Sequence, residues 1–98
     1  NSFVINSTDT VAATLFSSKN NLKMSVYTNQ PSVHIYVGGN CFDVLKGKND
    51  AVYHKTSGIC FETQNFPDAP NQAHFPDSVL KKGEEYIQNT VYKFENIN

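Results

Sequence analysis

The residue that first suggests chemistry is Glu62, the only charged side chain in the stretch formed by residues 58–64. The alternation of this stretch predicts a strand that places Cys60, Glu62 and Gln64 on one face. A charged side chain in the middle of such a strand is usually either solvated or functional. Spacing alone favours the solvated alternative, so Glu62 enters as a candidate acid or base that needs further support.

A rigid loop is expected directly after this strand. Residues 66–76 contain three of the four prolines, and proline cannot donate a hydrogen bond to a strand ladder. A carboxylate on a stiff strand beside a rigid loop is a suitable support for a positioned catalytic group. If Glu62 has that role, we expect its side chain to point inward and to be partly shielded from water.

Composition argues against several classes of partner and cofactor. The chain has 98 residues and a formal net charge of −1, so no excess charge attracts nucleic acid or an anionic membrane. No stretch is long and apolar enough to span a bilayer, and no signal peptide is visible. No cluster has metal-ligand spacing, and we expect neither a metal nor another cofactor. Cys41 and Cys60 are interpreted as reduced, buried thiols of a cytoplasmic protein, with a single bridge as the alternative.

Short alternating stretches predict an all-β fold. Strands are expected over residues 2–6, 11–17, 22–27, 33–37, 58–64 and 86–94. Turns are expected at 7–10, 19–21, 29–31, 38–40, 47–50 and 81–84, with one helical turn at 77–80. Val33, Ile35 and Val37 should face the core, and His34 and Tyr36 the opposite side. The pattern is typical of an antiparallel β-sandwich.

Several motifs, in this order, resemble the C-terminal part of the galactose mutarotase (aldose 1-epimerase) family. The main run, Glu-Thr-Gln-Asn-Phe-Pro-Asp-Ala-Pro-Asn-Gln, occupies residues 62–72. Further similar positions are 28–31, 36, 39–40, 45–48, 75–76, 80, 83–86 and 90–94. The resemblance implies a β-sandwich considerably longer than this chain. Residues 1–98 would then be the C-terminal portion of a single mutarotase-like domain.

The resemblance also assigns roles to two residues. Glu62 falls on the position that serves the family as general base, and His34 falls where relatives often have a glutamine that contacts the sugar. Histidine is a departure there, although imidazole can still donate or accept one hydrogen bond. The family's two catalytic histidines, its substrate-binding arginine and its sugar-binding aspartate would all precede Asn1. His54 and His74 match no functional position and are interpreted as surface or loop residues.

The implied activity is the interconversion of the α and β anomers of a hexose such as galactose or glucose. The monosaccharide is the expected ligand, and a missing N-terminal part of the same protein is the expected partner that supplies the acid. The 98 residues alone should therefore be inactive. One alternative is a non-catalytic carbohydrate-binding relative, in which Tyr36, Tyr86 and Tyr92 stack on the sugar. Another is a hexose-6-phosphate epimerase, but the eight Lys and Arg residues form no obvious phosphate site.

Overall fold

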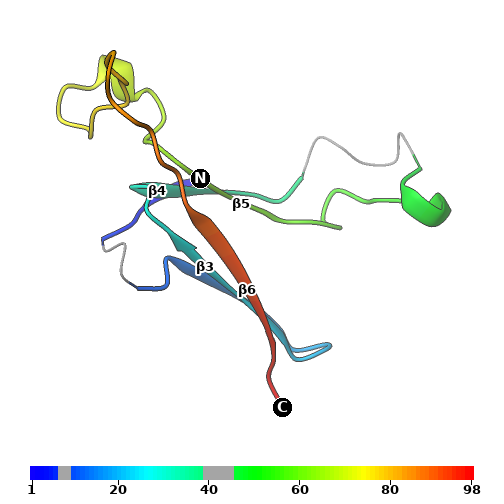
Figure 1. Ribbon diagram of the computed structural model, residues 1–98. Helices are drawn as coiled ribbons and strands as arrows, with labels where there is room; N and C mark the ends of the chain where they lie inside the picture. The colour runs from blue at the N-terminus through cyan, green and yellow to red at the C-terminus, as the bar shows by residue number, and fades with distance from the viewer. Residues whose placement is uncertain (7–9, 39–45) are drawn as a thin grey trace.

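The computed structural model describes residues 1–6, 10–38 and 46–98, which form two three-stranded antiparallel sheets (Figure 1). The strands are β1 (Ser2–Val4), β2 (Ala13–Ser17), β3 (Leu22–Thr28), β4 (Ser32–Tyr36), β5 (Cys60–Gln64) and β6 (Thr90–Asn96). Two 3-10 turns are η1 (Lys48–Asp50) and η2 (Ala69–Asn71). The strand orders are β1-β4-β5 and β2-β3-β6, with every neighbouring pair antiparallel. The predicted all-β class and antiparallel sandwich are confirmed.

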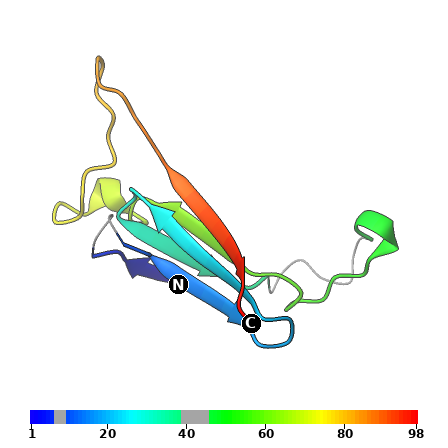
Figure 2. The same ribbon diagram turned by 60° about the horizontal axis from the view of Figure 1, so that its bottom comes forward.

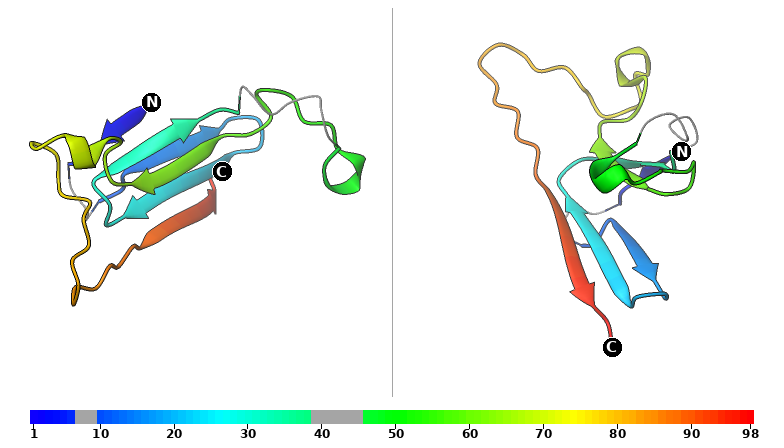
Figure 3. Two further views of the ribbon diagram at one scale, coloured as in Figure 1. Left: turned by 90° about the horizontal axis from the view of Figure 1, so that it is seen from above. Right: turned by 90° about the vertical axis from the view of Figure 1, so that its right-hand side faces the viewer.

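The two sheets pack against each other through a small apolar core (Figure 3). Val26 of β3, Val33 of β4 and Phe61 of β5 are only 0%, 2% and 7% exposed. Ile35 packs against this cluster, so the predicted core-facing side of β4 is confirmed for Val33 and Ile35. The prediction is wrong for Val37, which lies beyond the end of β4 and is 47% exposed.

The hairpin between β2 and β3 follows from its asparagines. Asn21 has a positive φ of 55°, a conformation that asparagine adopts more readily than most residues. The Asn20 side-chain oxygen accepts a hydrogen bond from the Leu22 amide at 3.2 Å. The turn predicted at 19–21 is therefore confirmed. Figure 2 shows the other neighbour of β3, the antiparallel strand β6.

A polar corner at residues 28–31 carries the chain from β3 in one sheet to β4 in the other. The Thr28 hydroxyl donates to the Asn89 carbonyl at 3.0 Å and accepts from the Gln30 amide at 3.1 Å. The Asn29 side chain accepts from the Asn89 amide at 3.0 Å and donates to the Ile87 carbonyl at 3.0 Å. Buried backbone groups need such partners. The polar side chains of this stretch thus have a structural role at the corner.

Near the C-terminus, one predicted element was wrong, and another was correct in type but not in its start. Residues 77–80 form no helical turn, because the Asp77 carboxylate accepts from the Val79 amide at 2.9 Å and closes a local turn instead. The last strand begins at Thr90 rather than at residue 86. Thr90 pairs with Thr28, the last residue of β3, so residues 86–89 have no opposite strand in this register.

The remaining turn predictions fare differently. The turns at 47–50 and 81–84 are confirmed by η1 and by the hydrogen bond from the Glu84 amide to the Lys81 carbonyl at 3.0 Å. Residues 7–9 of the first turn, residues 39–40 of another and Cys41 lie outside the described residues. Across the described ranges, no helix is long and apolar enough to cross a membrane.

Candidate functional site

The two predicted site residues lie directly opposite each other on neighbouring strands. His34 of β4 pairs with Glu62 of β5, and Ser2 of β1 pairs with His34 from the other side. Opposite residues in an antiparallel pair have Cβ atoms about 4.5–5.5 Å apart and share one face of the sheet. The sheet therefore places Ser2, His34 and Glu62 in one row across three strands.

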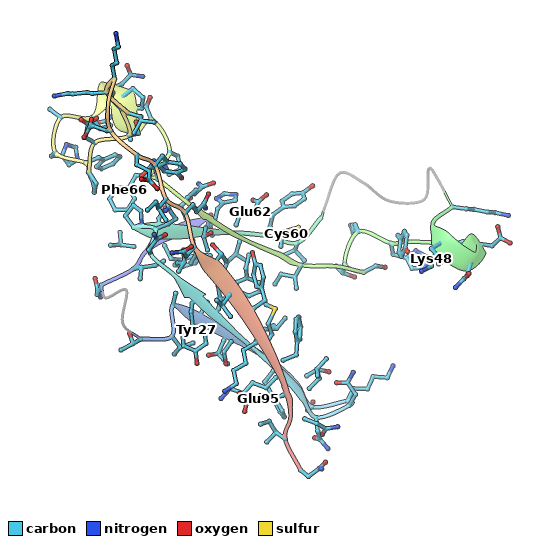
Figure 4. All side chains as sticks on the ribbon, viewed as in Figure 1. Tyr27, Lys48, Cys60, Glu62, Phe66 and Glu95 are labelled. Carbon is cyan, nitrogen blue, oxygen red and sulfur yellow. The ribbon has the colours of Figure 1, made fainter. Side chains whose placement is uncertain are left out.

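This row lies on the face of the β1-β4-β5 sheet that points away from the core. Val33 and Phe61 alternate with His34 and Glu62 and are buried against the second sheet. Figure 4 shows Glu62 and Cys60 along β5, well apart from Tyr27 of the second sheet. Side chains of the row are thus directed toward a surface and not into the interior.

Glu62 is exposed in this chain, so the expectation of a partly shielded carboxylate was wrong. The reason is its position on the outer face of β5, which is an edge strand of its sheet. Within the described part of the chain, no hydrogen bond or ion pair joins the Glu62 carboxylate to another side chain. The placement of this carboxylate consequently depends on the backbone of β5.

His34 is half-buried and is oriented by a neighbour that the sequence did not reveal. The Ser2 hydroxyl and His34 Nδ1 lie 2.8 Å apart, at hydrogen-bonding distance. A hydrogen bond at Nδ1 fixes the plane of the ring and directs Nε2 elsewhere. Nε2 can then offer one donor or one acceptor, which is part of what a glutamine amide offers. Ser2 could not be found from sequence because the strand register is not readable there.

Further along the same face, Tyr36 of β4 pairs with Cys60 of β5. Beside them is an apolar hollow of about 380 Å³ whose walls include Tyr53 and His54. His54 is exposed in a loop, as expected. Cys60 is a free thiol as predicted, but it is exposed, so its interpretation as buried was wrong.

The other two tyrosines considered as sugar platforms lie elsewhere. Tyr92 is opposite Val26 on the core-facing side of β6, and its hydroxyl donates to the Phe61 carbonyl at 2.6 Å. Tyr86 lies outside the strands, with its hydroxyl 3.4 Å from the Gln30 side-chain oxygen. Of the three tyrosines, only Tyr36 shares the face of Glu62.

The loop after β5 is held by one acidic side chain. Asp68 adopts a left-handed conformation with φ of 63°. Its carboxylate accepts from the Asn71 amide group at 2.6 Å and from the Gln72 amide group at 2.9 Å. The bonds from Gln72 and then Asn71 lower the pKa of Asp68 from its ordinary value of 3.8. Phe66 and Phe75 add an edge-to-face contact at 5.0 Å, and the ordered loop that was predicted is confirmed.

No set of three or more His, Cys, Asp or Glu side chains within residues 1–6, 10–38 and 46–98 is arranged to hold a metal ion. The absence of a metal or cofactor stays a prediction for the protein. The chemistry available on this face is that of a carboxylate, an imidazole and nearby hydroxyl and phenol groups. That set suits hydrogen bonding to a polyol and the transfer of a proton.

The profile of the aldose 1-epimerase family matches residues 1–93. This chain belongs to the aldose 1-epimerase family. It is 55% identical to the galactose mutarotase of Homo sapiens over 71 residues, which cover 72% of this chain and 21% of that protein. It is 34% identical to the aldose 1-epimerase of Escherichia coli over 86 residues, or 86% of this chain and 25% of that protein.

A solved structure supports the same assignment. The crystal structure of a GalM/aldose epimerase homologue from C. elegans matches with a TM-score of 0.87 and 32% identity. The match covers 99% of this aldose 1-epimerase family chain and 30% of the nematode chain. The chain thus spans between about a fifth and a third of the length of these relatives. Both the predicted family and its sandwich fold are confirmed.

Proposed function

We propose that this chain carries the general base of an aldose 1-epimerase that interconverts the α and β anomers of a hexose such as galactose or glucose. The observation that carries the proposal is the row in which Glu62 lies directly opposite His34. By resemblance, these two positions are the base of the family and a sugar contact. The relatives named galactose mutarotase and aldose 1-epimerase support the same reaction.

In the proposed reaction, the Glu62 carboxylate removes the proton from the C1 hydroxyl of the sugar. An acid donates a proton to the ring oxygen as the bond between C1 and that oxygen breaks, which gives the open-chain aldehyde. Rotation about the C1–C2 bond presents the other face of the carbonyl. The reverse proton transfers then close the ring and restore both groups, so that no atom or charge is gained or lost.

The acid is assigned to a longer, N-terminal part of the same protein, as the family resemblance implies, because among the described residues His34 alone lies directly opposite Glu62 across a pair of strands. His34 is proposed to contact a sugar hydroxyl through Nε2, with Ser2 holding the ring through Nδ1. A hexose seated on this face would displace water from the exposed Glu62 and so strengthen its interactions. The free Cys60 thiol supports a reducing, cytoplasmic compartment as part of this proposal.

The second candidate is a carbohydrate-binding relative without catalysis. The exposure of Glu62 and the half-buried Tyr36 on the same face favour it, since an aromatic side chain with polar neighbours can bind a sugar without transferring protons.

Polarimetry on freshly dissolved α-D-galactose separates the two candidates. An epimerase accelerates the drift of optical rotation in proportion to the concentration of the full-length protein. A binder changes no rate but still binds the sugar in calorimetry. A full-length protein that leaves the drift at the buffer rate would overturn the proposed activity.

A further inference from the structure

The two carbonyl groups that flank Glu62 along β5 each accept a hydrogen bond, one from a side chain of β6 and one from a side chain just before β6. β5 is an edge strand, so the backbone groups of Phe61 and Thr63 that point away from β4 have no partner strand. The Tyr92 hydroxyl donates to the Phe61 carbonyl at 2.6 Å. The Gln88 side-chain amide donates to the Thr63 carbonyl at 2.9 Å.

A hydroxyl contact completes this seam, which we define as Gln88, Thr90 and Tyr92 with their partners on β5. The hydroxyl oxygens of Thr63 and Thr90 lie 2.6 Å apart, and that of Thr28 lies 3.3 Å from Thr90. The start of β6 therefore closes one side of the sandwich through side chains and not through a strand ladder. In Figure 1 the beginning of β6 passes β5 at this point.

The seam matters for the site because, within the described part of the chain, the Glu62 side chain makes no hydrogen bond or ion pair that would fix it. On one edge of β5, the ladder with β4 sets the position of residue 62. On the other edge, the bonds to the carbonyls of Phe61 and Thr63 and the hydroxyl contact of Thr63 resist displacement of the strand. Buried or half-buried carbonyls that lose their donors are costly, so the strand would shift to recover a partner.

We propose that Tyr92 and Gln88 are positioning residues for the Glu62 carboxylate. Tyr92 in β6 and Gln88 just before it hold β5 in the position from which the Glu62 carboxylate reaches the C1 hydroxyl of the sugar. The inference rests on the proposed function, since it concerns the placement of the proposed base. Neither residue touches the sugar or the reacting atoms.

The test replaces each donor in the full-length protein with a side chain of similar shape that cannot donate. In Tyr92→Phe only the hydroxyl is lost, and in Gln88→Met only the amide. We expect kcat for mutarotation to fall about 10-fold in each variant, because a catalytic group displaced by 1 Å can lose about 10²-fold in rate. KM should stay within about twofold of the wild type, since sugar binding does not depend on these groups.

Tyr27→Phe is the matched control, because Tyr27 lies on the outer face of β3, opposite Val91 and away from β5. It should keep the wild-type kcat. All variants are compared at a temperature at which circular dichroism shows each to be fully folded. If Tyr92→Phe does not fold, Gln88→Met decides the question, because Gln88 is exposed and outside the strands.

A double-mutant comparison distinguishes positioning from general loosening of the fold. In a Glu62→Gln background, Tyr92→Phe should cause no further loss, because the group that it positions is absent. An equal loss in both backgrounds, or a wild-type kcat in both single variants, would overturn this inference while the epimerase assignment stands. A wild-type protein without mutarotase activity would instead overturn the proposed function on which it rests.

Discussion

At the scale of single residues, the site consists of one carboxylate and the partners that its strand register provides. Glu62 was predicted as a candidate from its unusual place in an apolar strand, and the role that we propose for it comes from family resemblance. Its pairing with His34 came only from the structure, which also added Ser2 as the partner of the ring. The sequence could not supply these contacts, because a shift of one residue in register would place different side chains opposite each other.

His34 provides a prediction at this scale. His34→Gln should retain mutarotase activity within a few-fold of the wild type, because an amide offers both a donor and an acceptor to the sugar. His34→Ala should raise KM by about 10-fold, which corresponds to one lost hydrogen bond of about 1 kcal/mol or slightly more. The measurement is KM for α-D-galactose with the full-length variants. An unchanged KM in His34→Ala would show that this ring does not contact the sugar.

At the scale of elements, two motifs that first suggested the family prove to have structural roles. The corner at residues 28–31 uses side chains to carry the chain between sheets, and the Asp68 carboxylate holds the loop that follows β5. These roles explain why asparagine, glutamine and aspartate occur there without any need for a ligand. They also place a stiff support immediately after the strand of Glu62.

The Asp68 loop should loosen in acid. Hydrogen bonds from Gln72 and Asn71 lower the pKa of Asp68, so their stabilising effect is present above pH 3.8 and is lost as the pH falls through the lowered folded-state value. Amide hydrogen exchange in residues 66–76, normalised for the intrinsic pH dependence, should therefore show less protection below about pH 3.8. In Asp68→Asn that extra loss should disappear, because the side chain no longer titrates. An identical acid response in the variant would contradict this account.

Strand positions were predicted well from alternation and turn residues, and element ends less well. The hairpin at Asn20 and Asn21 and the core side of β4 follow from local chemistry. The start of β6 does not follow from local chemistry, since it depends on where β3 ends and on the register between the two strands. The seam through Gln88 and Tyr92 was equally hidden, because side-chain contacts between sheets require the fold to be known.

At the scale of the whole molecule, the described core is small relative to the apolar surface that remains exposed. Among the residues that the structure describes, the buried apolar ones are Val26, Val33, Phe61 and Ala69, whereas Phe3, Phe16 and Phe94 are 50%, 51% and 61% exposed. Burial of one such side chain contributes about 1.5–3 kcal/mol, so a core of this size gives modest stability. The chain spans about a fifth to a third of the length of the three relatives named above.

The 98-residue chain on its own should show no mutarotase activity above the buffer rate. The reaction needs both a base and an acid, and this chain is proposed to supply only the base. Each of the two proton transfers typically contributes about 10²–10⁴-fold in rate. Polarimetry at high protein concentration tests this, with the full-length protein as the positive control. Substantial activity in the isolated chain would mean that its own residues supply the acid.

The most direct test of the central claim is the mutarotation rate of a full-length Glu62→Gln variant. Glu95→Gln is the control, since Glu95 lies in β6 and makes only a partly exposed ion pair with Lys93 at 3.9 Å, a type of contact that contributes little. With α-D-galactose, we expect Glu62→Gln to lose about 10²–10⁴-fold in kcat and Glu95→Gln to match the wild type. A Glu62→Gln variant as active as the wild type would contradict the assignment of Glu62 as the base.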